Sequence, residues 1–150
     1  MIAVIQRVSK AEVKLEKGSI ASIKRGLLIL LGVEEADNNE DLKWLVKKII
    51  PMRIFSDAEG KMNLSALDVQ GEFLVVSQFT LHAKTKKGNR PSFIKAAKPM
   101  QAEALYEDFI QELSIQSGYP VKHGKFGADM QISLINDGPM TIIIDTKNRH

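Results

Sequence analysis

The chain has 150 residues, of which 44% are hydrophobic, so it is long and apolar enough to form one domain around its own core. It contains no cysteine, which excludes disulfides, thiolate nucleophiles and thiolate metal ligands. Its 21 basic and 18 acidic residues leave a formal net charge of +3, which does not by itself select a class of partner. We therefore expect a single domain that spans residues 1–150.

The start of the chain does not resemble an export signal. Gln6, Arg7 and Lys10 interrupt the apolar positions early, and no cleavage site follows them. The longest apolar run, Leu27–Val33, is far shorter than the roughly 20 residues that a membrane-spanning helix needs. We expect a cytoplasmic protein without a membrane partner.

The N-terminal quarter is predicted to form a sheet. Alternating apolar and polar residues, many of them β-branched, indicate strands over residues 2–9, 11–16 and 19–24, with a turn at Lys17-Gly18. The uninterrupted apolar run at residues 27–33 is typical of a strand that is buried on both faces.

Two helices are predicted. Residues 39–50 carry apolar side chains at helical spacing, with Asn38 or Asn39 as the cap and Pro51 as the end. Pro99 opens a second helix, whose apolar face is followed by a stop at Gly118.

The remaining segments predict strands. Residues 52–65 indicate a hairpin with a turn at Asp57–Gly60, whose acidic residues lack the spacing of a calcium-binding loop. Residues 72–81 indicate one strand, and residues 121–145 indicate two strands around the sequence INDGPMT. This order predicts an α+β domain with mostly antiparallel or mixed sheets.

Polar residues interrupt the apolar strand predicted at residues 72–81. If the strand continues, Gln78 and Thr80 share one face, and Ser77 and Phe79 share the other. Polar groups where a strand leaves a core often line a pocket, with hydroxyl and amide groups to orient a substrate. The alternative is that they form hydrogen bonds across strands at a sheet edge.

Residues 82–98 form a basic segment that contains no acid. Its composition suits the phosphates of a nucleic acid, and Phe93 can stack on a base. A solvated loop is the alternative interpretation. The basic side chains are those of Lys84, Lys86, Lys87, Arg90, Lys95 and Lys98.

Two glycine-containing segments follow. In GKFGADM, Phe126 and Met130 are either walls of a pocket or core residues. In INDGPMT, Asp137-Gly138 is a hairpin signal, but Pro139 removes a ladder donor directly after the turn. Gly138 lets a ligand approach its backbone, and an X-Pro bond is cis in about 5–6% of cases; a trans proline on an edge strand is the alternative.

Together, and in this order, these motifs resemble the D-aminoacyl-tRNA deacylase family. The resemblance covers almost the whole chain. It rests on AVIQRV (residues 3–8), SQFTL (residues 77–81), NRPSF (residues 89–93), FGADM (residues 126–130) and the pattern Asn136-x-Gly138-Pro139-x-Thr141. It implies an α+β fold with a barrel-like core and two main helices, and a homodimer with active sites at the subunit interface. It implies no cofactor and no metal, and RNA rather than DNA as the partner.

The resemblance also implies an activity, which is hydrolysis of the ester between a D-amino acid, or a mischarged glycine, and the 3′ end of tRNA. A cis Gly138-Pro139 bond, which lies within the motif from Asn136 to Thr141, would enter the partner subunit's pocket and reject L-amino acids. Arg7 would support this motif. The facing wall would consist of Ser77, Gln78, Phe79 and Thr80. Phe126, Ala128 and Met130 would lie near the terminal adenosine, and Lys84, Lys86, Lys87, Arg90 and Phe93 would bind tRNA.

The residues leave the mechanism and the function class open. In one mechanism Thr80 is the nucleophile or the proton shuttle. In the other, backbone N–H groups near Phe79 and Thr80 stabilise the oxyanion, the ribose 2′-OH assists the reaction, and the hydroxyl of Thr80 is not needed. A tRNA- or RNA-binding module without catalysis and a small-molecule esterase are the alternatives to a deacylase.

Overall fold

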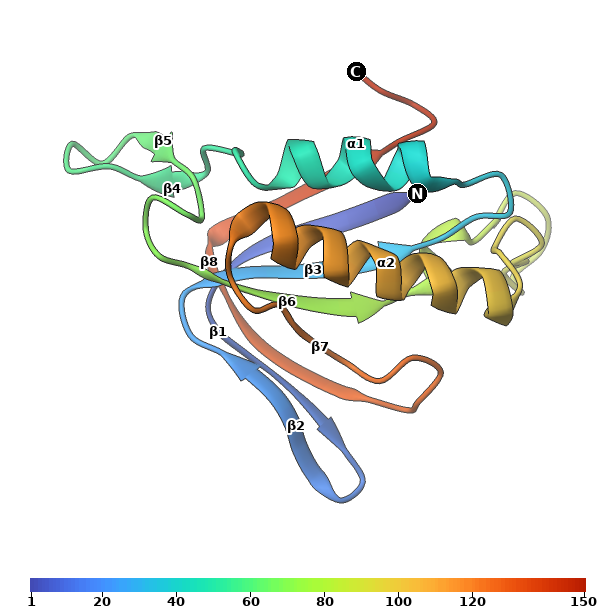
Figure 1. The fold of residues 1–150 in the computed structure, drawn as a ribbon. Coiled ribbons are helices and arrows are strands. Elements are labelled where there is room, and N and C mark those ends of the chain that lie inside the picture. The colour runs from blue at the N-terminus through green and yellow to red at the C-terminus, as the bar shows by residue number, and fades with distance from the viewer.

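The computed structural model describes residues 1–150 as a six-stranded sheet, a small two-stranded sheet and two long helices (Figure 1). The predicted α+β class, with a barrel-like sheet and two main helices, is confirmed. The elements in chain order are β1 (Ile2–Leu15), β2 (Gly18–Ile23), β3 (Gly26–Gly32), α1 (Asn39–Ile49), β4 (Phe55–Ser56), β5 (Met62–Leu64), β6 (Glu72–Ser77), the 3-10 helix η1 (Phe79–His82), α2 (Pro99–Ser117), β7 (Lys122–His123) and β8 (Gln131–Asp145).

Strand β1 organises the large sheet. It pairs antiparallel with β2 and β3 on one edge and with β8 on the other. Strand β6 adds to β3 in parallel, and β7 adds to β6 in parallel, so the sheet is mixed. The separate strands predicted at residues 2–9 and 11–16 are wrong, because β8 pairs with β1 on both sides of Lys10 and holds one strand of 14 residues together.

The helices lie on the same side of the sheet and cover the main core (Figure 1). The predicted helix at residues 39–50 is confirmed, and its apolar stripe, from Leu42 to Ile49, is buried. Asn38 caps it by accepting hydrogen bonds from the backbone N–H groups of Glu40 and Asp41. Pro99 opens α2 and Gly118 ends it in a left-handed conformation, as predicted. No helix is long and apolar enough to cross a membrane.

A buried ion pair joins the start of β1 to the turn after β3. The ammonium of Met1 lies 2.5 Å from Asp37 Oδ1, and both groups are fully buried. The other oxygen of Asp37 accepts a hydrogen bond from the Glu34 backbone N–H at 2.8 Å. The same turn contacts the end of the basic segment, because the backbone N–H of Glu35 donates a hydrogen bond to the carbonyl of Lys95 at 3.1 Å. This turn therefore anchors the residues that lead into α2.

Strand β6 is shorter than predicted. It ends at Ser77, and Phe79–His82 form a 3-10 turn instead of continuing the strand. The turn fits because Gly32 has no side chain: a Cβ there would lie 2.9 Å from the carbonyl oxygen of Gln78 and 3.1 Å from the Cβ of Leu81. The two faces predicted for Ser77, Gln78, Phe79 and Thr80 are therefore wrong.

The hairpin predicted around INDGPMT is also wrong, because β8 does not reverse. Its two halves pair with the two halves of β1, with Thr141 opposite Gln6 and Asn136 opposite Val8. One residue of β1, Arg7, therefore lies opposite the four residues 137–140 of β8, which form an enlarged β-bulge. A two-residue turn at Asp137-Gly138 would pair Asn136 with Pro139, which has no N–H for that pair.

Candidate active site

A cavity of about 600 Å³ lies where β6 leaves the sheet and α2 begins. Three segments far apart in the sequence form most of it, namely the end of β6 with η1, the approach to α2 with its first turn, and residues 126–132; Val33, directly after β3, completes the wall. It gathers seven residues of the predicted site, namely Ser77, Gln78, Phe79, Phe93, Phe126, Ala128 and Met130. The rest of the wall is largely apolar, so the cavity is a pocket with few polar groups that orient a ligand.

Two aromatic rings stand at one side of this cavity. The rings of Phe79 and Phe93 meet edge to face, with centroids 5.2 Å apart. Phe79 remains 54% exposed, so its ring is at the opening rather than in the core. The two rings flank the basic loop in the sequence, and the backbones of Lys84 and Ser92 pair and close this loop. Lys84, Lys86, Lys87 and Arg90 are exposed beside the opening and do not line the cavity.

Thr80 is not connected to a base. Its hydroxyl oxygen accepts a hydrogen bond from the Gln78 amide at 2.5 Å, and Thr80 is exposed outside the cavity wall. A carboxamide has no basicity with which to take a proton from a hydroxyl. The arrangement therefore orients Thr80 and Gln78 but does not activate Thr80 as a nucleophile.

The bulge of β8 is held by side chains on both of its flanks. Asn136 accepts a hydrogen bond from the Met140 backbone N–H at 2.8 Å and donates one to the Thr141 hydroxyl at 2.9 Å. These contacts explain why the pattern has Asn at its first position and Thr at its last. Between them the Gly138-Pro139 bond is cis, and both residues are exposed.

Arg7 supports the same bulge from β1. Its Nε donates to the carbonyl of Asp137 at 3.0 Å, and its Nη1 donates to the carbonyl of Ile54 at 2.6 Å. The guanidinium therefore ties the bulge to the segment before β4 with two fixed bonds. Within one chain, none of Arg7, Asn136, Gly138, Pro139 and Thr141 lines the cavity beside Phe79, so the structure does not bring these two parts of the predicted site together.

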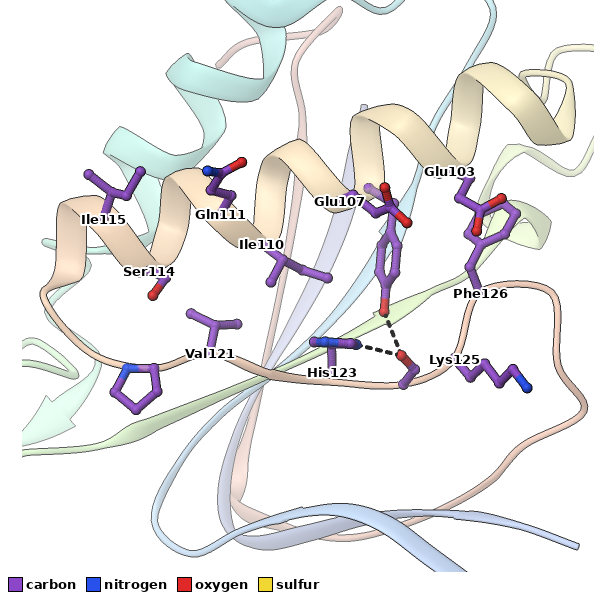
Figure 2. A pocket seen from close by; sticks show the side chains of 13 residues that line it. Glu103, Glu107, Ile110, Gln111, Ser114, Ile115, Val121, His123, Lys125 and Phe126 are labelled. Atoms are coloured by element: carbon purple, nitrogen blue, oxygen red, sulfur yellow. Dashed lines mark hydrogen bonds between the residues drawn. The ribbon is translucent and has the colours of Figure 1, made fainter.

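A second cavity, of about 670 Å³, was not predicted from the sequence (Figure 2). It lies between one flank of α2 and residues 120–126, and Phe126 is a wall of both cavities. The hydroxyl of Tyr106 lies at its floor and shares its one proton between the carbonyl oxygens of Val75 and Gly124, at 3.2 and 3.3 Å. Burial, aided by the negative charge of Glu107, raises the pKa of Tyr106 well above its usual value, so the phenol stays protonated.

Sequence periodicity shows why the second cavity was missed. Glu103 and Glu107 follow the ordinary pattern of an exposed helix face, and nothing local indicates that residues 120–126 lie opposite them. No group of three or more His, Asp or Glu side chains is placed to hold a metal ion.

Comparisons with known proteins agree on one family. The sequence matches the model of a family described as D-Tyr-tRNA(Tyr) deacylase over residues 4–145. Proteins named D-aminoacyl-tRNA deacylase from Cytophaga hutchinsonii and Akkermansia muciniphila are each 59% identical to the chain, and one from Flavobacterium psychrophilum is 58% identical. In each case the match covers 99% of both chains.

Two solved structures share the fold. One, described as a c-Myc DNA unwinding element binding protein, is 42% identical, with a TM-score of 0.90 over 97% of this chain and 98% of that chain. The other, described as a probable eukaryotic D-amino acid tRNA deacylase, is 18% identical, with a TM-score of 0.80 over 95% and 97%. At that identity the second structure is evidence for the fold alone.

Proposed function

Because the chain belongs to the D-Tyr-tRNA(Tyr) deacylase family, we propose that it hydrolyses the ester linking a D-amino acid to the 3′ end of tRNA. Glycine on a wrong tRNA is a further substrate, since it too lacks an L side chain. The enzyme acts in the cytoplasm on tRNA as an RNA ligand and needs no cofactor. The observation that carries the proposal is the cavity at the end of β6, which joins Ser77–Phe79 to Phe126–Met130 beside a basic loop.

The cavity suits the terminal adenosine of such a substrate. Its apolar and aromatic wall, which includes Phe79, Phe126, Ala128 and Met130, can pack against a base. The exposed cations of the adjacent loop can pair with phosphates of the acceptor stem. Lys84, Lys86, Lys87 and Arg90 are therefore proposed to bind tRNA, and Phe93 to contact a base.

A second copy of the chain would complete the site. The exposed Gly138-Pro139 bulge is proposed to enter the partner's cavity, where a main-chain carbonyl close to the substrate Cα leaves no room for an L side chain. Exclusion by backbone explains how one site accepts many D-amino acids. Two observations support a homodimer: β8 pairs only with β1, so its other edge is free, and Ile135 and Ile143 on it are exposed.

In the proposed chemistry, a water oxygen adds to the ester carbonyl, and the bond from that carbon to the ribose 3′-oxygen then breaks. Backbone N–H groups near Phe79 and Thr80 would stabilise the oxyanion, because they stand at the start of η1, where the first amides lack helical partners. The ribose 2′-OH would help activate the water, whose proton passes to the leaving 3′-oxygen. Alternatively it would first accept the acyl group as a 2′-ester, which water then hydrolyses to free D-amino acid and tRNA.

This mechanism predicts that Thr80 can be replaced. A Thr80→Ala enzyme should keep kcat on D-Tyr-tRNA within about threefold of the wild-type value, since its hydroxyl has only an amide neighbour and no base. Single-turnover hydrolysis measures this directly. Thr80→Ser is the matched variant that keeps the hydroxyl, and a large loss in Thr80→Ala that Thr80→Ser restores would assign the chemistry to Thr80.

The function itself is tested by incubating the enzyme with D-Tyr-tRNA and L-Tyr-tRNA in parallel. We expect rapid loss of the D ester and survival of the L ester. Salt-sensitive binding to RNA or DNA without cleavage would instead favour a nucleic-acid-binding module. The 42% identical structural relative is described as a DNA-binding protein, so DNA is included in this test. Cleavage of simple esters without tRNA would favour a general esterase.

A further inference from the structure

The second cavity adjoins the first along α2. Phe126 lines both, and neighbouring residues of α2 divide between them, with Ala102 in the first cavity and Glu103 in the second. Figure 2 shows the second cavity roofed by α2 and closed below by the chain from Val121 to Phe126. A single-stranded ligand whose end occupies the first cavity would therefore meet the second with its next unit.

The wall of the second cavity combines an apolar floor with an acidic rim. Ile110, Val121 and Phe126 provide half-buried apolar surface, and the buried ring of Tyr106 packs against Phe126 with centroids 5.8 Å apart and planes tilted by 46°. Glu103 and Glu107 lie one turn apart on the same face of α2, and Figure 2 draws no hydrogen bond from their carboxylates to the other residues that line the cavity. Like charges at this spacing destabilise a helix, so the folded chain gains nothing from the pair.

The surrounding groups define what such a rim can bind. Carboxylates accept hydrogen bonds and repel phosphates, so they suit an uncharged ring that carries an amino group. Lys125 and the amide of Gln111 line the same cavity and can donate to ring oxygen or nitrogen atoms. The imidazole Nδ1 of His123 lies 2.7 Å from the Gly124 carbonyl, which only accepts, so this nitrogen carries the proton.

We infer that the second cavity binds the cytosine of the cytidine that precedes the terminal adenosine in every tRNA. The exocyclic amine of cytosine donates to Glu103 or Glu107, its acceptor atoms face Lys125 and Gln111, and its ring packs against Phe126 and Ile110. This inference rests on the proposed function, because it places the terminal adenosine in the first cavity. It adds a subsite that reads a base, whereas the basic loop contacts phosphates without reading sequence.

The test compares D-Tyr-tRNA ending in CA with D-Tyr-tRNA ending in UA. Uracil presents a carbonyl oxygen where cytosine has its amine, so a carboxylate that accepts from cytosine repels uracil. We expect kcat/KM to fall about tenfold for the UA substrate, mainly through KM, which is the usual size of one base-edge contact. In the variant Glu103→Gln/Glu107→Gln the ratio between the substrates should fall from about ten to about one.

The matched control is Asp108→Asn/Glu112→Gln, which removes the same charge from α2 at positions outside the cavity. Its CA to UA ratio should remain about ten, so that a general effect of charge on RNA binding is separated from base reading. Equal rates on the two substrates in the wild-type enzyme, or an unchanged ratio in Glu103→Gln/Glu107→Gln, would overturn the inference and leave the proposed function standing. No hydrolysis of D-Tyr-tRNA ending in CA would overturn the proposed function itself.

Discussion

A Gly138→Ala enzyme is expected to lose about 100-fold in kcat/KM on D-Tyr-tRNA, because a displacement of about 1 Å in a positioning group has an effect of this size. Gly138 has a φ of +133°, which side-chain-bearing residues rarely adopt. A Cβ would also lie 2.7 Å from Arg7 Nη2 and 3.2 Å from the Met140 backbone nitrogen. These are the groups that hold the bulge, so the added methyl moves the carbonyls proposed to select for chirality.

The matched control for this variant is Gly60→Ala in the turn between β4 and β5. Gly60 also has a positive φ, of +80°, but a Cβ there meets no atom within 4 Å. Both variants should lose stability through backbone strain of about 1–3 kcal/mol, and only Gly138→Ala should lose activity. Thermal unfolding and initial rates on D-Tyr-tRNA separate the two effects. Activity of Gly138→Ala within threefold of Gly60→Ala would argue against any role of the bulge in selection.

The sequence predicted an element correctly where the residues that determine its conformation lie within the element itself. The helix at Asn39–Ile49 was predictable because its cap, its apolar spacing and its stop are all within the same stretch of sequence. The hairpin from Phe55 to Leu64 was predictable for the same reason, since its turn residues bond to one another: the N–H of Asp57 donates to the carbonyl of Lys61 at 2.8 Å.

The errors arose where a distant segment decides the local conformation. Nothing in residues 72–81 reveals that Gly32, on another strand, leaves room for a 3-10 turn after Ser77. Similarly, Asp137-Gly138 has the composition of a hairpin turn, but β1 is long enough to pair with the chain on both sides of it. The register between two long strands depends on their whole length, and a bulge of four residues against one is invisible to period-2 patterning.

The site residues also differ in whether the sequence around them was enough to predict them. The candidate wall residues were found because SQFTL and FGADM are recognisable motifs, and the structure places all of them except Thr80 around one cavity. Glu103, Glu107 and Lys125 belong to no motif, and their shared cavity exists only because α2 packs beside the chain after β7. The bulge at Gly138 lies outside the cavity of its own chain, so its proposed role depends on a second copy that no single-chain pattern describes.

The second large effect is expected from the substrate rather than from the protein. D-Tyr-tRNA whose terminal adenosine lacks the 2′-OH should be hydrolysed at least about 100-fold more slowly, which is the lower end of what a positioned acid or base contributes. The protein offers no substitute at the proposed site of reaction: the hydroxyl of Thr80 accepts a hydrogen bond from the Gln78 amide, and the wall of the adjacent cavity contains no carboxylate or histidine.

The 2′-OH is proposed to act in the transition state, so kcat should fall while KM stays near its value for the unmodified substrate. D-Tyr-tRNA lacking the 2′-OH of the preceding cytidine is the matched control, since it removes the same group one nucleotide away and should react at the normal rate. Single-turnover rates on the three substrates, with wild-type enzyme and with Thr80→Ala, distinguish the two mechanisms. If the terminal 2′-deoxy substrate reacted normally and Thr80→Ala were inactive, the hydroxyl of Thr80 would have to be the reacting group, and Gln78 would be the residue that orients it for attack.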